Sequence, residues 1–291
     1  SNTIEDFSIA RSDKTPTFIL SNLIDDDFEN VTNVIRGNDH TINTVKQKML
    51  SNALNFKEIH YAHIPLIHDI EGKKLSKRDN ITNVEDYLND GYLAASIFNF
   101  IIKLGNNFND IEYLNIDEAV KNFNLSKTVL SPAKFDIEKL NFINQYYLKE
   151  LSFSNFNKYL EKDVKDQVSS FKLEPVYKDI LERCHKYTEI NLEVVKLYDF
   201  FKKNSVLEID KNEKDLIKKI HTIINNLHDN DNTVSILEKN GLPLKKIGKI
   251  IRKITVNFES KIPIEKIFIF FGIENIKERL LLYINDWWKK I

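Results

Sequence analysis

The spacing of apolar and polar positions changes about one third of the way along the chain. The first third contains short runs of β-branched and aromatic residues with polar ends, a pattern typical of strands, at 17–20, 31–35 and 62–67. A helical spacing over residues 44–54 lies between the last two runs, and the acidic run at 25–27 predicts a turn between the first two. Strand, helix and strand in this order indicate a βαβ unit with a parallel sheet.

From about residue 84 onward, apolar residues recur at three- and four-residue steps, which predicts helices. We expect the first of these to end at Gly105, and another to begin at Ser131-Pro132, where a capping residue precedes a proline. Further helices are predicted at 175–187, 192–201, 213–227, 234–240, 243–255, 263–271 and 274–288. The predicted fold class is therefore α/β followed by all-α.

Composition narrows the class of protein. The chain has 291 residues, with 42 basic and 43 acidic side chains, so a uniformly basic coat for nucleic acid is excluded, although a local basic face is not. The single cysteine, Cys184, excludes a disulfide framework and a cysteine-based zinc site. No apolar run approaches the roughly 18 residues of a membrane helix, and the first residues do not form a signal peptide. We expect a cytoplasmic protein with no membrane partner.

Two segments rich in basic residues stand out against the overall balance of acidic and basic side chains. Residues 241–291 carry eleven basic and five acidic side chains, which favours an RNA-facing C-terminal end. The segment Gly72-Lys73-Lys74-Leu75-Ser76-Lys77-Arg78 places four cations in a short glycine-led loop between a predicted strand and a predicted helix. Such a loop suits a polyphosphate ligand, but a solvated basic loop has the same composition, and spacing alone leaves both interpretations open.

The neighbourhood of this loop carries a resemblance to a known family. The segment 74–78 resembles the Lys-Met-Ser-Lys-Ser signature of class I aminoacyl-tRNA synthetases, and 62–67 resembles the strand that leads to it in bacterial glutamyl-tRNA synthetases. Upstream, 11–18, Asp25-Asp26 and 34–40 match that family in order and spacing. The first third of the chain therefore resembles the bacterial glutamyl-tRNA synthetases.

The resemblance implies a domain organisation. The family's other signature, His-Ile-Gly-His, is absent from the sequence, so we expect a C-terminal portion that lacks the N-terminal half of the catalytic domain and is inactive alone. The implied parts are the C-terminal half of a Rossmann-type catalytic domain, a signature loop with a helical stem-contact region, and an α-helical anticodon-binding domain in two subdomains. Their expected boundaries are 1–68, 69–140, 141–205 and 206–291.

The resemblance also implies an activity, that of a glutamate–tRNA ligase. In the family, ATP activates glutamate to glutamyl-adenylate, and the glutamyl group then passes to the 3′ end of tRNA(Glu). By position, the implied catalytic residues are Lys77 and Lys74. The implied ATP-binding residues are Lys77, Lys74, Ser76, Arg78, Ile67, His40 and Asp39. Mg²⁺ is expected only as a companion of the ATP substrate, with no tightly bound metal.

Specificity is implied for a smaller set of residues. Arg36 matches the arginine that binds the side-chain carboxylate of the substrate, and Asn22 matches a residue that orients the amino acid. Phe18 occupies another glutamate-binding position, but the family generally has tyrosine there; Asn38 also departs from a usually acidic position. Arg252 matches a residue that binds an anticodon base.

Several alternatives remain open at this point. A non-discriminating synthetase would also charge tRNA(Gln), and a non-catalytic tRNA-binding paralogue would keep only RNA affinity. A glutaminyl-tRNA synthetase is disfavoured because its anticodon part is a β-barrel, and a glutamyl-queuosine synthetase because it lacks an anticodon domain. The expected partners are tRNA(Glu), with tRNA(Gln) as the open alternative, glutamate and ATP, and the expected state is a monomer.

Overall fold

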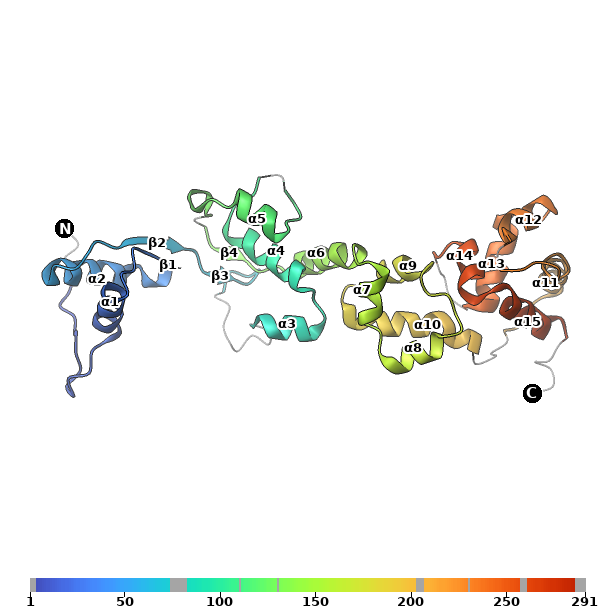
Figure 1. Cartoon of the computed structure of the whole chain (residues 1–291), viewed down its shortest axis with the longest axis horizontal. Helices are drawn as coiled ribbons and strands as arrows, with labels where there is room; N and C mark the ends of the chain where they lie inside the picture. The colour runs from blue at the N-terminus through green and yellow to red at the C-terminus, as the bar shows by residue number, and fades with distance from the viewer. Residues whose placement is uncertain are drawn as a thin grey trace. The chain divides into compact units, whose positions relative to one another are not determined.

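The computed structural model describes residues 4–73, 83–109, 111–129, 131–202, 207–229, 231–256 and 261–285. The chain divides into two compact units. Figure 1 labels helices and strands of both. Unit 1 contains Ser1–Thr82 and Phe98–Lys139, and unit 2 contains Asn83–Ile97 and Leu140–Ile291. Each unit is therefore built from two separate stretches of chain. The units do not simply follow one another along the sequence. The four-part division expected above stays a prediction.

The predicted βαβ unit is confirmed at the start of unit 1. Strand β1 (Asn33–Gly37) pairs in parallel with β2 (His60–Ile64), with Arg36 opposite His63. Helix α2 (Thr41–Leu54) connects the two strands, as a parallel pair requires. A second parallel pair joins β3 (Ile67–His68) to β4 (Ala133–Lys134).

The run at 17–20 was predicted as a strand, and this prediction is wrong. Helix α1 (Phe18–Phe28) begins there instead, with Thr17 as its N-cap residue and Leu23 fully buried. The predicted acidic turn at 25–27 is the last turn of the same helix. A four-residue apolar run carries too little periodicity to separate a strand from the first turn of a helix, so packing decides between them.

The predicted helix start at Ser131-Pro132 is also wrong. The residues that follow form β4, and helix α6 (Ile137–Lys149) begins later. The Asp136 carboxylate accepts hydrogen bonds from the backbone N–H groups of Glu138 (3.0 Å) and Lys139 (3.3 Å). Asp136 therefore supplies the cap that the sequence pattern assigned to Ser131.

The rest of unit 1 is a small helical layer. Helix α4 (Ala94–Gly105) ends at Gly105, as predicted, but the single helix expected from about residue 84 is divided in two, since a separate helix over Val84–Asp90 ends before Gly91. Helix α5 (Ile116–Asn122) follows α4. Between them, Phe108, Leu114 and Ala119 form a small buried core.

Unit 2 is helical, as predicted for the later part of the chain, and its described part contains no strand. The helices that lie wholly or mostly in it are α3 (Val84–Asp90), α6, α7 (Phe153–Lys158), α8 (Lys162–Val168), α9 (Tyr177–Leu181), α10 (Ile190–Lys202), α11 (Lys211–Ile224), α12 (Thr233–Lys239), α13 (Leu244–Thr255), α14 (Ile264–Phe271) and α15 (Ile273–Ile284). The helix predicted at 175–187 is shorter than expected, because α9 ends at Leu181 and a separate 3₁₀ turn covers Tyr187–Glu189. No helix in the described ranges is long and apolar enough to cross a membrane.

One hydrophobic core runs through unit 2, and it buries Cys184 completely. Burial raises the pKa of this thiol to about 12, as expected for an inert core cysteine. The core also holds Arg279, whose Nε donates to the Ile254 carbonyl at 2.7 Å and whose guanidinium lies over the Phe200 ring. An arginine is tolerated there because its Nε finds a carbonyl acceptor and its charge lies against aromatic rings.

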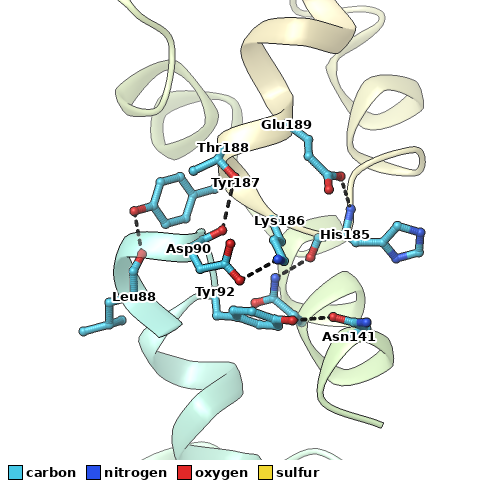
Figure 2. A network of polar contacts seen from close by, with 10 residues as sticks. Leu88, Asp90, Tyr92, Asn141, His185, Lys186, Tyr187, Thr188 and Glu189 are labelled. Carbon is cyan, nitrogen blue, oxygen red and sulfur yellow. Dashed lines mark hydrogen bonds and ion pairs between the residues drawn. The ribbon is translucent and has the colours of Figure 1, made fainter. Parts of the chain in front are cut away.

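The turn between α3 and α4 is fastened to the segment 185–189 (Figure 2). Lys186 forms an ion pair with Asp90 at 2.5 Å, and the Tyr187 hydroxyl donates to the Leu88 carbonyl at 2.8 Å. Gly91, at φ +106°, lies so close to this segment that a Cβ atom would approach Thr188 Oγ1 to 2.5 Å. Only glycine therefore allows this close approach.

The buried side chain of Asn144 links the start of α4 to the segment 185–189. Its Oδ1 accepts from the Leu93 N–H (2.8 Å) and the Ser96 hydroxyl (2.6 Å), and its Nδ2 donates to the His185 carbonyl (2.5 Å). The side chain is fully buried and is the acceptor for the buried Leu93 N–H, whereas the Ser96 hydroxyl also lies 2.7 Å from the Leu93 carbonyl oxygen.

We expect Asn144→Leu to lower the free energy of unfolding by about 3 kcal/mol, because it leaves the buried Leu93 N–H unpaired and also removes the bonds to Ser96 and to the His185 carbonyl. Tyr92→Phe is the matched control: it removes one hydroxyl bond to Asn141 (2.6 Å) and should cost about 1 kcal/mol. Urea unfolding followed by far-ultraviolet circular dichroism measures both. Equal losses in the two variants would contradict the role assigned to Asn144.

Candidate functional site

The site is built around Arg36, near the end of β1. Its Nη2 donates to Thr44 Oγ1 and to Gln47 Oε1, each at 2.6 Å. Thr44 and Gln47 lie three residues apart on α2 and are both buried, so one helix face presents two oxygen atoms to the guanidinium. The guanidinium carbon also lies 5.1 Å from the centroid of the Tyr61 ring.

Helix α1 joins this arrangement through Asn22. The Gln47 side chain, which accepts from Arg36, donates through Nε2 to Asn22 Oδ1 at 2.8 Å. A continuous chain of hydrogen bonds therefore runs from α1 through α2 to β1. It fixes two of the predicted glutamate-binding residues, Asn22 and Arg36, relative to each other.

The charge of Arg36 is not neutralised by an ion pair with any residue in the described ranges. Its hydrogen-bond acceptors are neutral, and its buried Nε has no hydrogen-bond partner among the described residues. Burial raises the pKa of the nearby Asp26 carboxyl, and the charge of Arg36 offsets this only in part. A partly buried cation held by neutral groups favours an anionic ligand.

His63 lies opposite Arg36 in the strand pairing and contacts the same threonine. Its Nε2 is 2.8 Å from Thr44 Oγ1, and the hydroxyl already accepts from Arg36. A neutral imidazole with an unprotonated Nε2 fits this contact, because the hydroxyl can then donate to it. Burial lowers the pKa of His63, and the charges of Arg36 and His40 lower it further.

The remaining predicted residues of this region lie close by. The Phe18 ring, half exposed at the start of α1, is 5.7 Å from the His40 ring. Asp39 and His40 form a 3₁₀ turn with Asn38 between β1 and α2. A Cβ atom at Gly37 would lie 2.6 Å from Asp39 Oδ1, so a larger residue there would have to displace the Asp39 side chain.

Other predicted residues are placed elsewhere. Ile67 begins β3 and pairs with Ala133. The signature segment that contains Lys74, Ser76, Lys77 and Arg78 lies outside the described residues.

Sequence reasoning missed Thr44 and Gln47, and it covered His63 only as part of the segment 62–67. The signal for the first two was their helical spacing directly after the motif at 34–40. The signal for His63 was its place in a strand that the βαβ pattern pairs with β1. Each signal requires the parallel register to be known before it can be used.

In unit 2, helix α13 separates an apolar face from a basic one. Its isoleucines at 247, 250, 251 and 254 are buried, whereas Lys245, Lys246 and Lys249 are exposed. Arg252 is half buried; its Nη2 donates to the Ile262 carbonyl at 3.1 Å, and its Nε has no hydrogen-bond partner within the described part of the chain. This helix is suited to contact phosphates, with one arginine held in a fixed place.

A metal centre is not formed by the described residues, which contain no group of three or more His, Cys, Asp or Glu side chains suited to hold one ion.

Comparisons with known proteins match this geometry. Residues 1–142 match the model for the catalytic domain of class I tRNA synthetases (E and Q). Glutamate–tRNA ligase 2 of Ehrlichia chaffeensis is 33% identical over 90% of this chain and 56% of that protein. Over most of its length, the chain is similar to glutamyl-tRNA synthetases. A second similar protein, glutamate–tRNA ligase 1 of Campylobacter hominis, is 33% identical over 95% of the chain and 62% of its own length.

A solved structure of the same family supports the fold. The glutamate tRNA ligase from Elizabethkingia meningosepticum, crystallised in complex with its amino acid, is similar to the chain with a TM-score of 0.78 and 25% identity. The match covers 98% of this chain and 63% of that one. The chain thus spans little more than half the length of the curated family members it matches.

We expect the His63 imidazole to titrate below its ordinary pKa of 6.5 and the fold to lose stability as the pH falls. In this range the unfolded chain binds more protons than the folded chain, so the contribution of His63 is complete above pH 6.5 and is lost as the pH approaches the lower folded pKa. Titration of the ring by NMR in the whole chain measures the midpoint. His63→Gln, which keeps a hydrogen-bond acceptor for Thr44, assigns the resonance and should flatten the pH dependence of unfolding; a midpoint at or above 6.5 would refute the expectation.

Proposed function

We propose that the chain supplies part of the catalytic site and the anticodon-reading end of a glutamate–tRNA ligase. The reaction is ATP-dependent activation of glutamate to glutamyl-adenylate, followed by transfer of the glutamyl group to the 3′ end of tRNA(Glu). The observation that carries the proposal is the charge of Arg36, held on the neutral acceptors Thr44 and Gln47 and without an ion pair in the described ranges. The match of residues 1–142 to the family's catalytic domain supports it.

In this proposal Arg36 binds the side-chain carboxylate of glutamate, and Asn22 orients the amino acid. The planar guanidinium suits a carboxylate better than an ammonium does, because it offers donors in a fixed geometry. Phe18 lines the same pocket with its ring but offers no hydroxyl. The contact between Phe18 and His40 supports a common pocket for these residues.

For the adenylation step, Lys77 and Lys74 stabilise negative charge on the phosphates, and Ser76 and Arg78 shape their loop. Ile67 binds the adenine through its backbone, and Asp39 and His40 line the ATP side of the pocket. ATP enters as its Mg²⁺ complex, so the cation belongs to the substrate. The protein then contributes positioning and fixed positive charge rather than covalent chemistry.

Recognition of tRNA falls to the helical part of the chain. Arg252 is the proposed reader of an anticodon base, and the exposed lysines of α13 are proposed phosphate contacts. We propose tRNA(Glu) as the cognate partner, a monomer as the working state and the cytoplasm as the compartment. Charging of tRNA(Gln) is the remaining variant of the same function.

Arg36→Lys tests the glutamate site. We expect it to lower kcat/KM for glutamate by about 100-fold in ATP–pyrophosphate exchange, because the ammonium keeps the charge but loses the planar fork. The assay uses the chain joined to the part of the Ehrlichia relative that it does not span. Arg183→Lys, an Arg-to-Lys change in unit 2 that keeps an ion pair with Glu193, is the control and should leave the rate unchanged. If the unsubstituted chimera shows no glutamate-dependent exchange, the proposed function fails.

Arg252→Gln tests the anticodon site in the chain as it stands. We expect it to weaken binding to tRNA(Glu) by about tenfold and to leave binding to an anticodon-substituted tRNA(Glu) nearly unchanged, because a base contact is lost. Lys249→Gln is the matched control, and it should weaken binding to both RNAs equally through the loss of one phosphate contact. Affinities are measured over a range of salt concentrations, with tRNA(Gln) as a third ligand. Equal effects of Arg252→Gln on all three RNAs would remove its assigned role.

A further inference from the structure

The side chain of Gln47 is the least exposed group of the Arg36 cluster. It is fully buried, and both ends of its amide are used: Oε1 accepts from Arg36 at 2.6 Å, and Nε2 donates to Asn22 at 2.8 Å. An amide is the one side-chain group that offers an acceptor and a donor side by side without charge. Both partners are residues to which the proposed function gives a role in binding glutamate.

Arg36 has a second fixed contact beside this one. Its Nη2 carries two protons, and Thr44 and Gln47 accept both of them. The orientation of the guanidinium is therefore set by α2, whereas its positive charge stays available because both acceptors are neutral. A carboxylate at position 47 would hold the same orientation but would neutralise the charge.

We propose that Gln47 is a positioning residue for amino-acid selectivity: it fixes Arg36 and Asn22 relative to each other and keeps Arg36 unneutralised for the carboxylate of the substrate. This inference rests on the proposed function, and it deepens it by assigning selectivity to a residue that touches neither reacting group. Neutrality is the essential property, because glutamate presents a charged carboxylate to Arg36, whereas its isostere glutamine presents a neutral amide with a donor in place of one acceptor oxygen.

The test compares Gln47→Glu with Gln47→Met in the chimera described above. The readouts are KM and kcat for glutamate and for glutamine, and KM for ATP, in ATP–pyrophosphate exchange. Ser51→Ala is the control, since Ser51 is also buried and lies one turn further along α2, outside this set of contacts.

Gln47→Glu keeps the length and the acceptor oxygen. We expect it to raise KM for glutamate by about tenfold or more and to shift the ratio of kcat/KM from glutamate toward glutamine by a similar factor, while KM for ATP stays constant. Gln47→Met removes both hydrogen bonds. We expect it to raise KM for glutamate with little change in kcat, because it weakens binding of the ground state and the transition state alike.

The outcomes separate the two proposals. Absence of exchange with glutamate in the unsubstituted chimera overturns the proposed function. Normal exchange there, together with an unchanged glutamate-to-glutamine ratio in a folded Gln47→Glu, overturns the positioning role alone. If Gln47→Glu does not fold, as judged by circular dichroism, Gln47→Met decides: a rise in KM confined to glutamate supports the role, and an equal fall in kcat with unchanged KM values overturns it.

Discussion

Arg36 carries a permanent positive charge and forms no ion pair within the described ranges. The start of this chain is arranged around that constraint. Arginine cannot shed its proton, so the protein must satisfy the guanidinium of Arg36 by geometry. It does so with oxygens of Thr44 and Gln47 and with the face of the Tyr61 ring. These partners come from α2 and β2, so the packing of the βαβ unit and the shape of the candidate site are set by the same contacts.

Unit 2 meets a different constraint, that of joining helices that are distant in sequence. Asn144 satisfies backbone groups at Leu93 and His185, and Lys186 pairs with Asp90. The close approach at Gly91 brings the segment 185–189 against the turn between α3 and α4 (Figure 2). Polar groups therefore specify which helices meet here, whereas the apolar core supplies most of the burial.

The sequence could predict those parts of the fold that depend on the local spacing of apolar and polar residues. The βαβ unit, the end of α4 at Gly105 and most helices of unit 2 follow from apolar spacing and from scarce helix breakers. The run at 17–20 failed because its four residues fit a strand and a helix start equally well, and only the burial of Leu23 decides. At Ser131-Pro132 the local pattern is that of a helix start, but the residues that follow form β4 and pair with β3.

The candidate site divides in the same way. Arg36 and Asn22 could be predicted because a motif of fixed spacing carries them. Gln47 and Thr44 could not, since their importance depends on which face of α2 meets β1, and that is a tertiary property. The roles of Lys74 and Lys77 stay predictions, because their segment lies outside the described residues.

The departure at Phe18 can be weighed in these terms. Its ring lies 5.7 Å from that of His40, so the aromatic packing expected of this position is present without a hydroxyl. A pocket that lacks this donor has one fewer polar contact for its ligand, and discrimination against a neutral isostere then falls more heavily on charge. Under the proposed function, that charge belongs to Arg36, and it is useful only while its acceptors remain neutral. Under the proposed function, the absence of a tyrosine hydroxyl at Phe18 therefore makes the uncharged amide of Gln47 more consequential.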